Sequence, residues 1–134
     1  MSVATLPVED LTAYLIANAG LTALVNGRIY SQVLPQHAVL PAIVYSQIHG
    51  KAGNTMENAS GFTDATFQFA CMAMSYYDAK KTAKSLRAAL EGFAGTMGST
   101  KVYGAFQEAE RDGFDFETLE YRTDLDFKIW HLEA

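Results

Sequence analysis

The sequence has 134 residues, the size of one compact domain, and we expect residues 1–134 to fold as a single unit. Hydrophobic residues make up 49% and charged residues 19%, a balance that excludes a disordered tail or a collagen-like fibre. The net charge of −5 disfavours stable binding of DNA or RNA, since phosphates repel an acidic protein. No apolar run approaches the length of a membrane span, so we expect no membrane association.

The N-terminal part of the chain has the pattern of a helix. Pro7 suits a first helical position, and Glu9 and Asp10 suit the positive end of the helix dipole. Apolar residues follow at spacings of three and four, which predicts a helix ending at Gly20. The same spacing continues for one further turn over residues 21–25.

A second helix follows a capping sequence in the middle of the chain. Ser75 and Asp78 match a capping box, and an apolar stripe then repeats at helical spacing from Ala79 to Phe93. Glycines at 92 and 95 are expected to end this helix.

The predicted strands are rich in β-branched and aromatic residues or alternate between apolar and polar residues. Between two of them, residues 49–61 are Gly-, Asn- and Ser-rich without periodicity, which predicts a long loop. We predict strands at 28–30, 42–48, 63–74, 101–107 and 119–129. The order of elements indicates an α+β fold: an antiparallel sheet of four to five strands with two main helices packed on one face.

Charge is distributed unevenly along the chain. Residues 108–134 hold nine acidic and three basic residues, a net charge of −6, whereas residues 1–107 carry +1. The predicted second helix carries a basic outer face. An acidic C-terminal hairpin and a basic helix are therefore the two charged surfaces that we expect.

The sequence offers no convincing catalytic, cofactor or metal site, and we predict that the protein is not an enzyme. Cys71 lies on a predicted strand and is interpreted as a buried small hydrophobe. The three histidines lack ligand spacing, and the acidic turn at 112–117 lacks the order of a calcium-binding loop. The first residues lack the segments of a secretion signal, and with one cysteine we expect a reducing cytoplasm.

Four segments in order are similar to the tail-completion family of long-tailed bacteriophages, also called tail-terminator or tail-to-head joining proteins. The segments are residues 21–30, 40–45, 77–92 and 121–127. The likeness spans about residues 8 to 130. One departure is Phe69-Ala70-Cys71-Met72, where the family leads us to expect a more polar run that contains tryptophan.

This resemblance implies a structural protein of a virion or phage-like particle, and related proteins occur in gene transfer agents. It implies a homo-oligomeric ring, commonly of six copies, at the head-proximal end of the tail. Such a ring ends polymerisation of the tail-tube protein and joins the tail to a head-completion or connector protein. DNA passes through it without specific binding, and assembly takes place in the bacterial cytoplasm.

Three surfaces are candidates for these roles. Subunits would contact each other through the basic helix face and an acidic partner: Lys80, Lys84 and Arg87 with Glu108, Asp124 and Asp126. The predicted loop would become ordered on docking to the tube or connector, through Lys51, Asn54, Met56 and Asn58. An acidic lumen that repels DNA would be formed by Asp112, Asp115 and Glu117.

Other interpretations stay open at this point. The acidic excess also suits an ordinary solvated surface, and the basic helix face a solvated helix. A different neck or tail-tube component could share the fold. A small α+β enzyme or ligand-binding domain would use a cleft near Asp112, Asp115 and Glu117.

Overall fold

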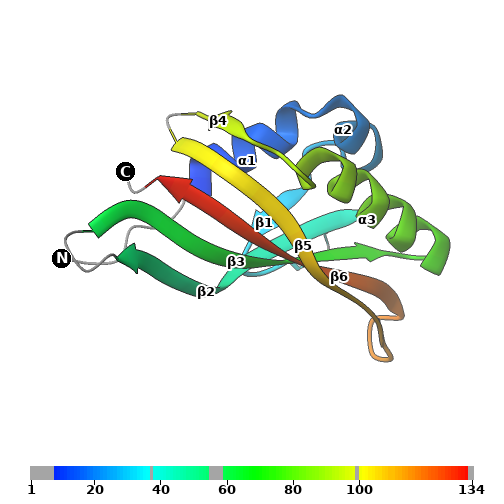
Figure 1. The fold of residues 1–134 in the computed structure, drawn as a ribbon. Coiled ribbons are helices and arrows are strands. Elements are labelled where there is room, and N and C mark those ends of the chain that lie inside the picture. The colour runs from blue at the N-terminus through cyan, green and yellow to red at the C-terminus, as the bar shows by residue number, and fades with distance from the viewer. Residues whose placement is uncertain (1–7, 37, 55–58, 99, 133–134) are drawn as a thin grey trace.

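The computed structural model describes residues 8–36, 38–54, 59–98 and 100–132, as three helices and one six-stranded sheet (Figure 1). The helices lie over one face of the sheet, which confirms the predicted α+β class. The helices are α1 (Val8–Ala17), α2 (Ala19–Val25) and α3 (Tyr76–Leu90). The strands are β1 (Ile29–Ser31), β2 (Ala42–Asn54), β3 (Ala59–Ala73), β4 (Gly95–Met97), β5 (Thr100–Asp115) and β6 (Glu120–Leu132).

The N-terminal helical segment is divided at Asn18, whereas the sequence predicts one helix as far as Gly20. Asn18 has extended backbone angles, and its side-chain oxygen accepts a 3.0 Å hydrogen bond from the N–H of Leu21. The side chain thereby caps a new helix, α2, which ends at Asn26 in the left-handed conformation. Both helices bury apolar side chains in the core: Leu11, Leu15, Leu21 and Val25.

The second predicted helix is confirmed as α3. The hydroxyl of Ser75 accepts a 3.1 Å hydrogen bond from the N–H of Asp78, as a capping residue should. After the helix, Gly92 has a φ of +75° and donates its N–H to the carbonyl of Ala105 on β5 (2.8 Å). The buried stripe contains Ala79, Ala83, Leu86 and Leu90.

The sheet has the strand order β1-β2-β3-β6-β5-β4, so the expectation of four to five antiparallel strands is corrected at both edges. At one edge β1 runs parallel to β2, with Ile29 opposite Ile43. At the other edge β4 adds a sixth strand that pairs with β5. β4 has only three residues, too few for a period-2 pattern to indicate a strand.

Much of the segment 49–61, predicted to be a loop, extends the β2–β3 hairpin instead: residues 49–54 belong to β2 and residues 59–61 to β3, while residues 55–58 lie outside the described residues. β2 continues to Asn54 and β3 begins at Ala59, with Lys51 opposite Asp64. Two register shifts interrupt this part of β2 and remove the alternation that normally indicates a strand. Backbone pairing between the two strands therefore extends β2 and β3 into this segment in spite of its Gly- and Asn-rich composition.

β5 also extends beyond its predicted end, through the acidic residues as far as Asp115. Its partner β6 confirms the predicted alternation, because Leu125, Phe127 and Ile129 are buried on the helix face. Residues 109–115 of β5 pair with β6 and are mostly exposed, although Glu110 and Asp112 still contact Lys80 of α3. The β5–β6 hairpin thus projects from the body of the molecule (Figure 1).

The core between the helices and the sheet is rich in aromatic rings. Phe69 is fully buried, and its ring centroid lies 5.7 Å from that of Tyr45 and 5.9 Å from that of Phe127. Cys71, next on the same face, is also fully buried, which confirms the prediction of a small hydrophobe. Phe69 and Cys71 of this run therefore pack in the core between the sheet and the helices.

Candidate assembly surfaces

The outer face of α3 carries the predicted basic side chains. They are Lys80, Lys81, Lys84 and Arg87. Lys81, Lys84 and Arg87 are exposed, and Lys80 is partly buried. Within the described part of the chain, Lys84 and Arg87 have no ion-pair partner. These two cations are therefore available for a contact with another molecule.

Lys80, in contrast, is engaged within its own chain. Its ammonium group forms ion pairs with Glu110 and, at 3.2 Å, with Asp112, both on β5. The hydrogen bond to Glu110 is the main cause that raises the pKa of Lys80. The pKa of Asp112 is lowered, chiefly by a hydrogen bond from the hydroxyl of Tyr76 and also by Lys80 and Thr123. This cluster fastens α3 to β5.

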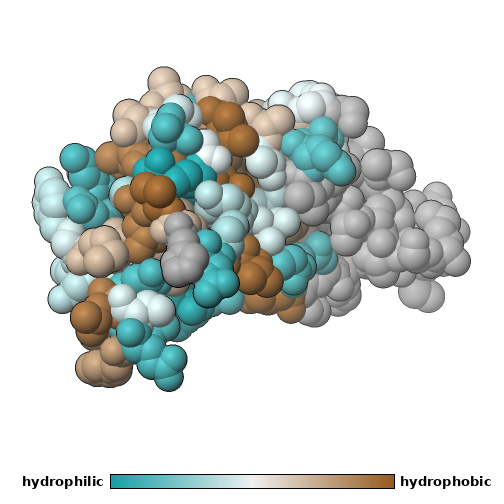
Figure 2. Space-filling model, turned by 180° about the vertical axis from the view of Figure 1, so that it is seen from behind, coloured by the Kyte–Doolittle hydropathy of each residue, from teal (hydrophilic) through white to brown (hydrophobic). Residues whose placement is uncertain are grey.

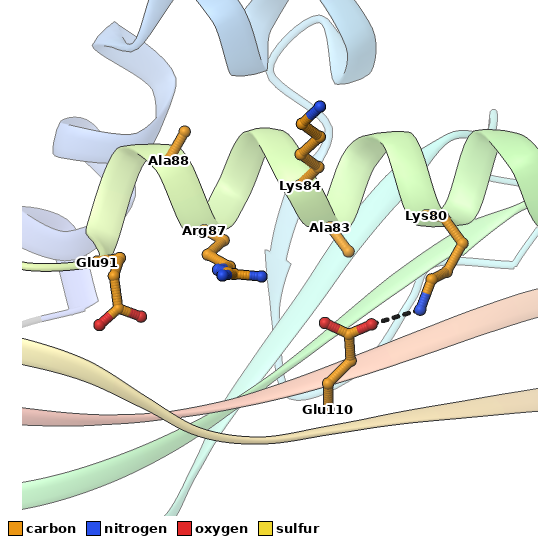
Figure 3. Close-up of a pocket in the computed structure, with 7 residues that line it drawn as sticks. All are labelled: Lys80, Ala83, Lys84, Arg87, Ala88, Glu91 and Glu110. Carbon is orange, nitrogen blue, oxygen red and sulfur yellow. Dashed lines mark hydrogen bonds and ion pairs between the residues drawn. The ribbon is translucent and has the colours of Figure 1, made fainter.

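An open groove separates α3 from β5 (Figure 3). Its sides are formed by Lys80, Ala83, Lys84, Arg87, Ala88, Glu91 and Glu110. Figure 3 shows Arg87 and Glu91 pointing towards β5, on the same side of the helix as Lys80. Lys84 and Ala88 point to the opposite side, away from β5. The basic residues of α3 therefore lie on two different sides of the helix.

A second groove lies on the other side of α3, against α2. It is lined by Gly20, Leu24, Tyr77, Lys80, Lys81, Lys84, Ser85 and Ala88. Three lysines and no acidic residue line it. We call it the α2–α3 groove. Lysines lie beside the apolar surface of Leu24, Tyr77 and Ala88 in this groove. The groove therefore suits a partner surface that combines apolar side chains with negatively charged ones.

The three acidic residues predicted for the subunit interface all have partners in their own chain. Asp126 forms a bidentate pair with Arg111, with both N–O distances 2.9 Å. The nearest oxygen of Asp124 lies 2.6 Å from Nε of Arg122. The carboxylate oxygen Oε2 of Glu108 lies 3.6 Å from Nζ of Lys128. Of the residues proposed for that interface, Lys84 and Arg87 are unpaired within the described ranges, whereas the acids pair with basic neighbours on the sheet.

The three residues predicted for an acidic lumen lie along the β5–β6 hairpin in different environments. Asp112 is held by the cluster around Lys80. Asp115 accepts hydrogen bonds from the backbone N–H groups of Glu117 (2.9 Å) and Thr118 (3.3 Å), which lower its pKa. Glu117 is exposed and has no ion-pair partner among the described residues. Asp115 and Glu117 line a shallow, open pocket at the hairpin together with Arg122 and Asp124, whereas Asp112 is not among its lining residues.

Aromatic residues gather at the hairpin end, a feature that the charge pattern of the sequence does not indicate. The ring of Phe114 lies 5.0 Å from that of Phe116 and 4.8 Å from that of Tyr121. Phe116 is 83% exposed and Leu119 is 59% exposed. Figure 2 shows hydrophobic and hydrophilic atoms side by side at this end, at the lower left. The alternation Phe114-Asp115-Phe116 was the available sequence signal.

Two of the four residues predicted to dock onto the tube or connector lie in the last part of β2. Lys51 and Asn54 belong to β2. Met56 and Asn58 lie outside the described residues. The docking hypothesis thus concerns the end of a hairpin, whereas the sequence pattern predicts a long loop.

Other kinds of site find no support in the described part of the chain. No group of three His, Cys, Asp or Glu side chains there is arranged to hold a metal ion. Burial raises the pKa of the Cys71 thiol, which disfavours the reactive thiolate. Among the described helices, none combines the length and the apolar character needed to cross a membrane.

Comparison with known proteins agrees with the sequence resemblance. The family model described as tail completion protein gp17 matches residues 9–132. No curated protein matches the sequence. A chain from the virion of a native gene transfer agent particle has a similar fold, with a TM-score of 0.67 at 21% identity, covering 91% of this chain and 90% of that chain. Because the family model matches nearly the whole sequence, the chain belongs to the tail completion protein gp17 family and is a structural protein of a bacteriophage or phage-like tail.

Proposed function

We propose that the chain forms a closed ring of six copies at the head-proximal end of the tail. The ring ends polymerisation of the tail tube and joins the tail to the head connector. The observation that carries this proposal is membership of the tail completion family over residues 9–132. A protein that completes a tail acts where the tail ends and meets the next component.

The distribution of charge supports assembly into a ring. A closed ring of identical subunits needs two unlike surfaces on each copy, one for each neighbour. The chain has a basic face on α3 and an acidic β5–β6 hairpin that projects on another side of the molecule (Figure 1). Opposite charge on unlike surfaces favours contact between one copy and the next.

The ring also lets DNA pass from head to tail. The net charge of −5 keeps the duplex from binding tightly, because like charges repel. That Asp112, Asp115 and Glu117 line the lumen stays a prediction. Asp112 adds little to such a field, since Lys80 lies 3.2 Å from it.

Removal of the gene from a particle-producing strain tests the proposal. We expect unjoined heads and tails of irregular length, with normal particles restored by the wild-type gene. Electron microscopy of intact particles should then place six copies of the chain in a ring at the neck. Joined tails of normal length without the protein would contradict this function, and density along the tube would assign the chain to a tube component instead.

The end of the β2–β3 hairpin is our candidate for docking onto the tube or connector. Lys51 lies opposite Asp64, so the hairpin can be shortened at this pair and closed with an Asn-Gly turn, which matches the twist of two strands. We expect rings of the shortened protein that fail to join tails. Finished particles at wild-type yield would rule out the docking role.

A further inference from the structure

The end of the β5–β6 hairpin combines exposed apolar side chains with unpaired carboxylates. Phe116 and Leu119 are 83% and 59% exposed. Glu117 and Glu120 have no ion-pair partner within the described part of the chain. We call residues 116–120 the hairpin tip. Exposed apolar side chains clustered among polar ones are typical of a surface that contacts another protein.

The hairpin tip is held in one shape by its own hydrogen bonds. The side-chain carboxylate of Asp115 accepts hydrogen bonds from the backbone N–H groups of Glu117 and Thr118. The backbone carbonyl of Asp115 accepts a 2.8 Å hydrogen bond from the N–H of Leu119. The ring of Phe116 packs edge-on against Phe114. A preorganised tip loses less conformational entropy on binding than a flexible one.

The α2–α3 groove has the complementary chemistry. Lys81 and Lys84 are exposed at its side, and neither has an ion-pair partner among the described residues. Leu24 and the exposed Ala88 supply apolar surface between α2 and α3. The groove on the other side of α3 is less suitable, because Glu91 and Glu110 line it and would repel an acidic tip.

The tip and the groove of one molecule lie on different sides of the fold. In Figure 1 the β5–β6 hairpin continues from the sheet and projects to the lower right, away from α1 and α2 at the top. The tip therefore reaches such a groove only on a second copy. A contact between two unlike surfaces can repeat from copy to copy and close into a ring.

We infer that the hairpin tip of one copy docks into the α2–α3 groove of the next copy. Phe116 packs against Leu24 and Ala88, and Glu117 pairs with Lys84. This inference rests on the proposed ring and specifies how its subunits join. It also assigns Glu117 to a subunit contact and away from the lumen.

Disulfide trapping in assembled particles tests the contact. We place cysteines at the tip and in the groove of the same chain with Thr118→Cys and Ala88→Cys. Buried Cys71 contributes no background. After purified particles are treated with a mild oxidant, which accepts the two electrons released by each thiol pair, non-reducing electrophoresis should show a ladder of dimers, trimers and larger species that ends at the copy number of the ring. Each single variant, and Thr118→Cys combined with Val33→Cys at an exposed position outside the groove, should give no ladder.

Charge reversal provides a second measurement. Lys84→Glu should lower the yield of joined particles at least about tenfold, and adding Glu117→Lys should restore much of it. Arg87→Glu, on the same helix but outside this groove, should have a smaller effect. Circular dichroism of each variant shows whether it is folded.

The outcomes separate this inference from the proposed function. Rings at the neck that form no ladder, or folded Lys84→Glu protein that joins particles normally, would overturn the docking contact and leave the ring intact. Absence of any ring at the neck in wild-type particles would overturn the proposed function itself. Duplex DNA retained by wild-type protein but not by Lys84→Glu, with no ladder, would assign the groove to nucleic acid and also overturn the contact.

Discussion

The hydroxyl of Tyr76 donates a 2.9 Å hydrogen bond to a carboxylate oxygen of Asp112, linking the first turn of α3 to β5. The other oxygen of Asp112 accepts from Lys80 and, at 3.1 Å, from the hydroxyl of Thr123. The contact lies where the β5–β6 hairpin leaves the body of the fold. It therefore fixes the direction of the hairpin relative to α3.

Replacing Tyr76 with Phe should raise the pKa of Asp112. In the wild-type protein this pKa lies below its ordinary value of 3.8, first because of the hydrogen bond from Tyr76. A carboxyl group whose pKa is lower in the folded than in the unfolded state stabilises the fold at pH values above the unfolded-state pKa. This contribution to stability disappears as the pH falls through the folded-state pKa. Titration of the Asp112 carboxyl carbon by NMR measures the change directly.

The free energy of unfolding of the wild-type protein should therefore depend more on acidic pH than that of Tyr76→Phe. As the pH falls below about 4, wild-type protein should lose stability more steeply than Tyr76→Phe, which has less of this contribution to lose. Tyr77→Phe is the matched control, because Tyr77 is 70% exposed and has no hydrogen bond to a described carboxylate. Identical titration curves for Asp112 in wild type and Tyr76→Phe would contradict the assignment.

Leu86→Ala should destabilise the fold strongly. Leu86 is fully buried in the core cluster, so truncation removes buried apolar surface and leaves a cavity. We expect a loss of about 2–5 kcal/mol in the free energy of unfolding, measured with urea. Val33→Ala, at a side chain that is 72% exposed, should change it by less than about 0.5 kcal/mol. Equal effects of the two substitutions would place Leu86 outside the core.

The sequence predicted best those elements that carry one buried and one exposed face. α3 was predictable because Ser75 marks its start and the apolar stripe has helical spacing. β6 was predictable because its side chains alternate between core and solvent. After Ala109, β5 leaves the core and its sequence has no apolar periodicity. This part of the strand forms through backbone pairing with β6, which the sequence pattern does not indicate.

The partners of charged residues were less predictable than the charged surfaces themselves. Clustering along the sequence indicated a basic helix and an acidic hairpin, and both exist. Lys80 and Glu110, however, are 30 residues apart and meet only because α3 packs beside β5. Such a pairing depends on tertiary geometry, so the sequence could not show which charges remain free for another subunit.

Gly98→Ala should destabilise the turn between β4 and β5. Gly98 has a φ of +57°, a left-handed conformation that costs a residue with a Cβ about 1–2 kcal/mol. An added Cβ would also lie 2.1 Å from a carboxylate oxygen of Asp10, whose other oxygen accepts a hydrogen bond from Thr100. Gly113→Ala is the control, because no atom lies within 4 Å of its added Cβ. Unfolding curves showing no difference between these variants would contradict the strain at Gly98.

Cys71 should react with thiol reagents only when the protein unfolds. The side chain is fully buried, and burial raises the pKa of its thiol, so the folded protein presents neither access nor thiolate. We expect no modification by a chromogenic disulfide reagent under native conditions and one thiol per chain in denaturant. A surface control, Val33→Cys, should react at once under native conditions because this position is 72% exposed. Cys71 lies on β3, between β2 and β6. Rapid native labelling of wild-type protein would therefore show that the middle of the sheet opens far more readily than its packing implies.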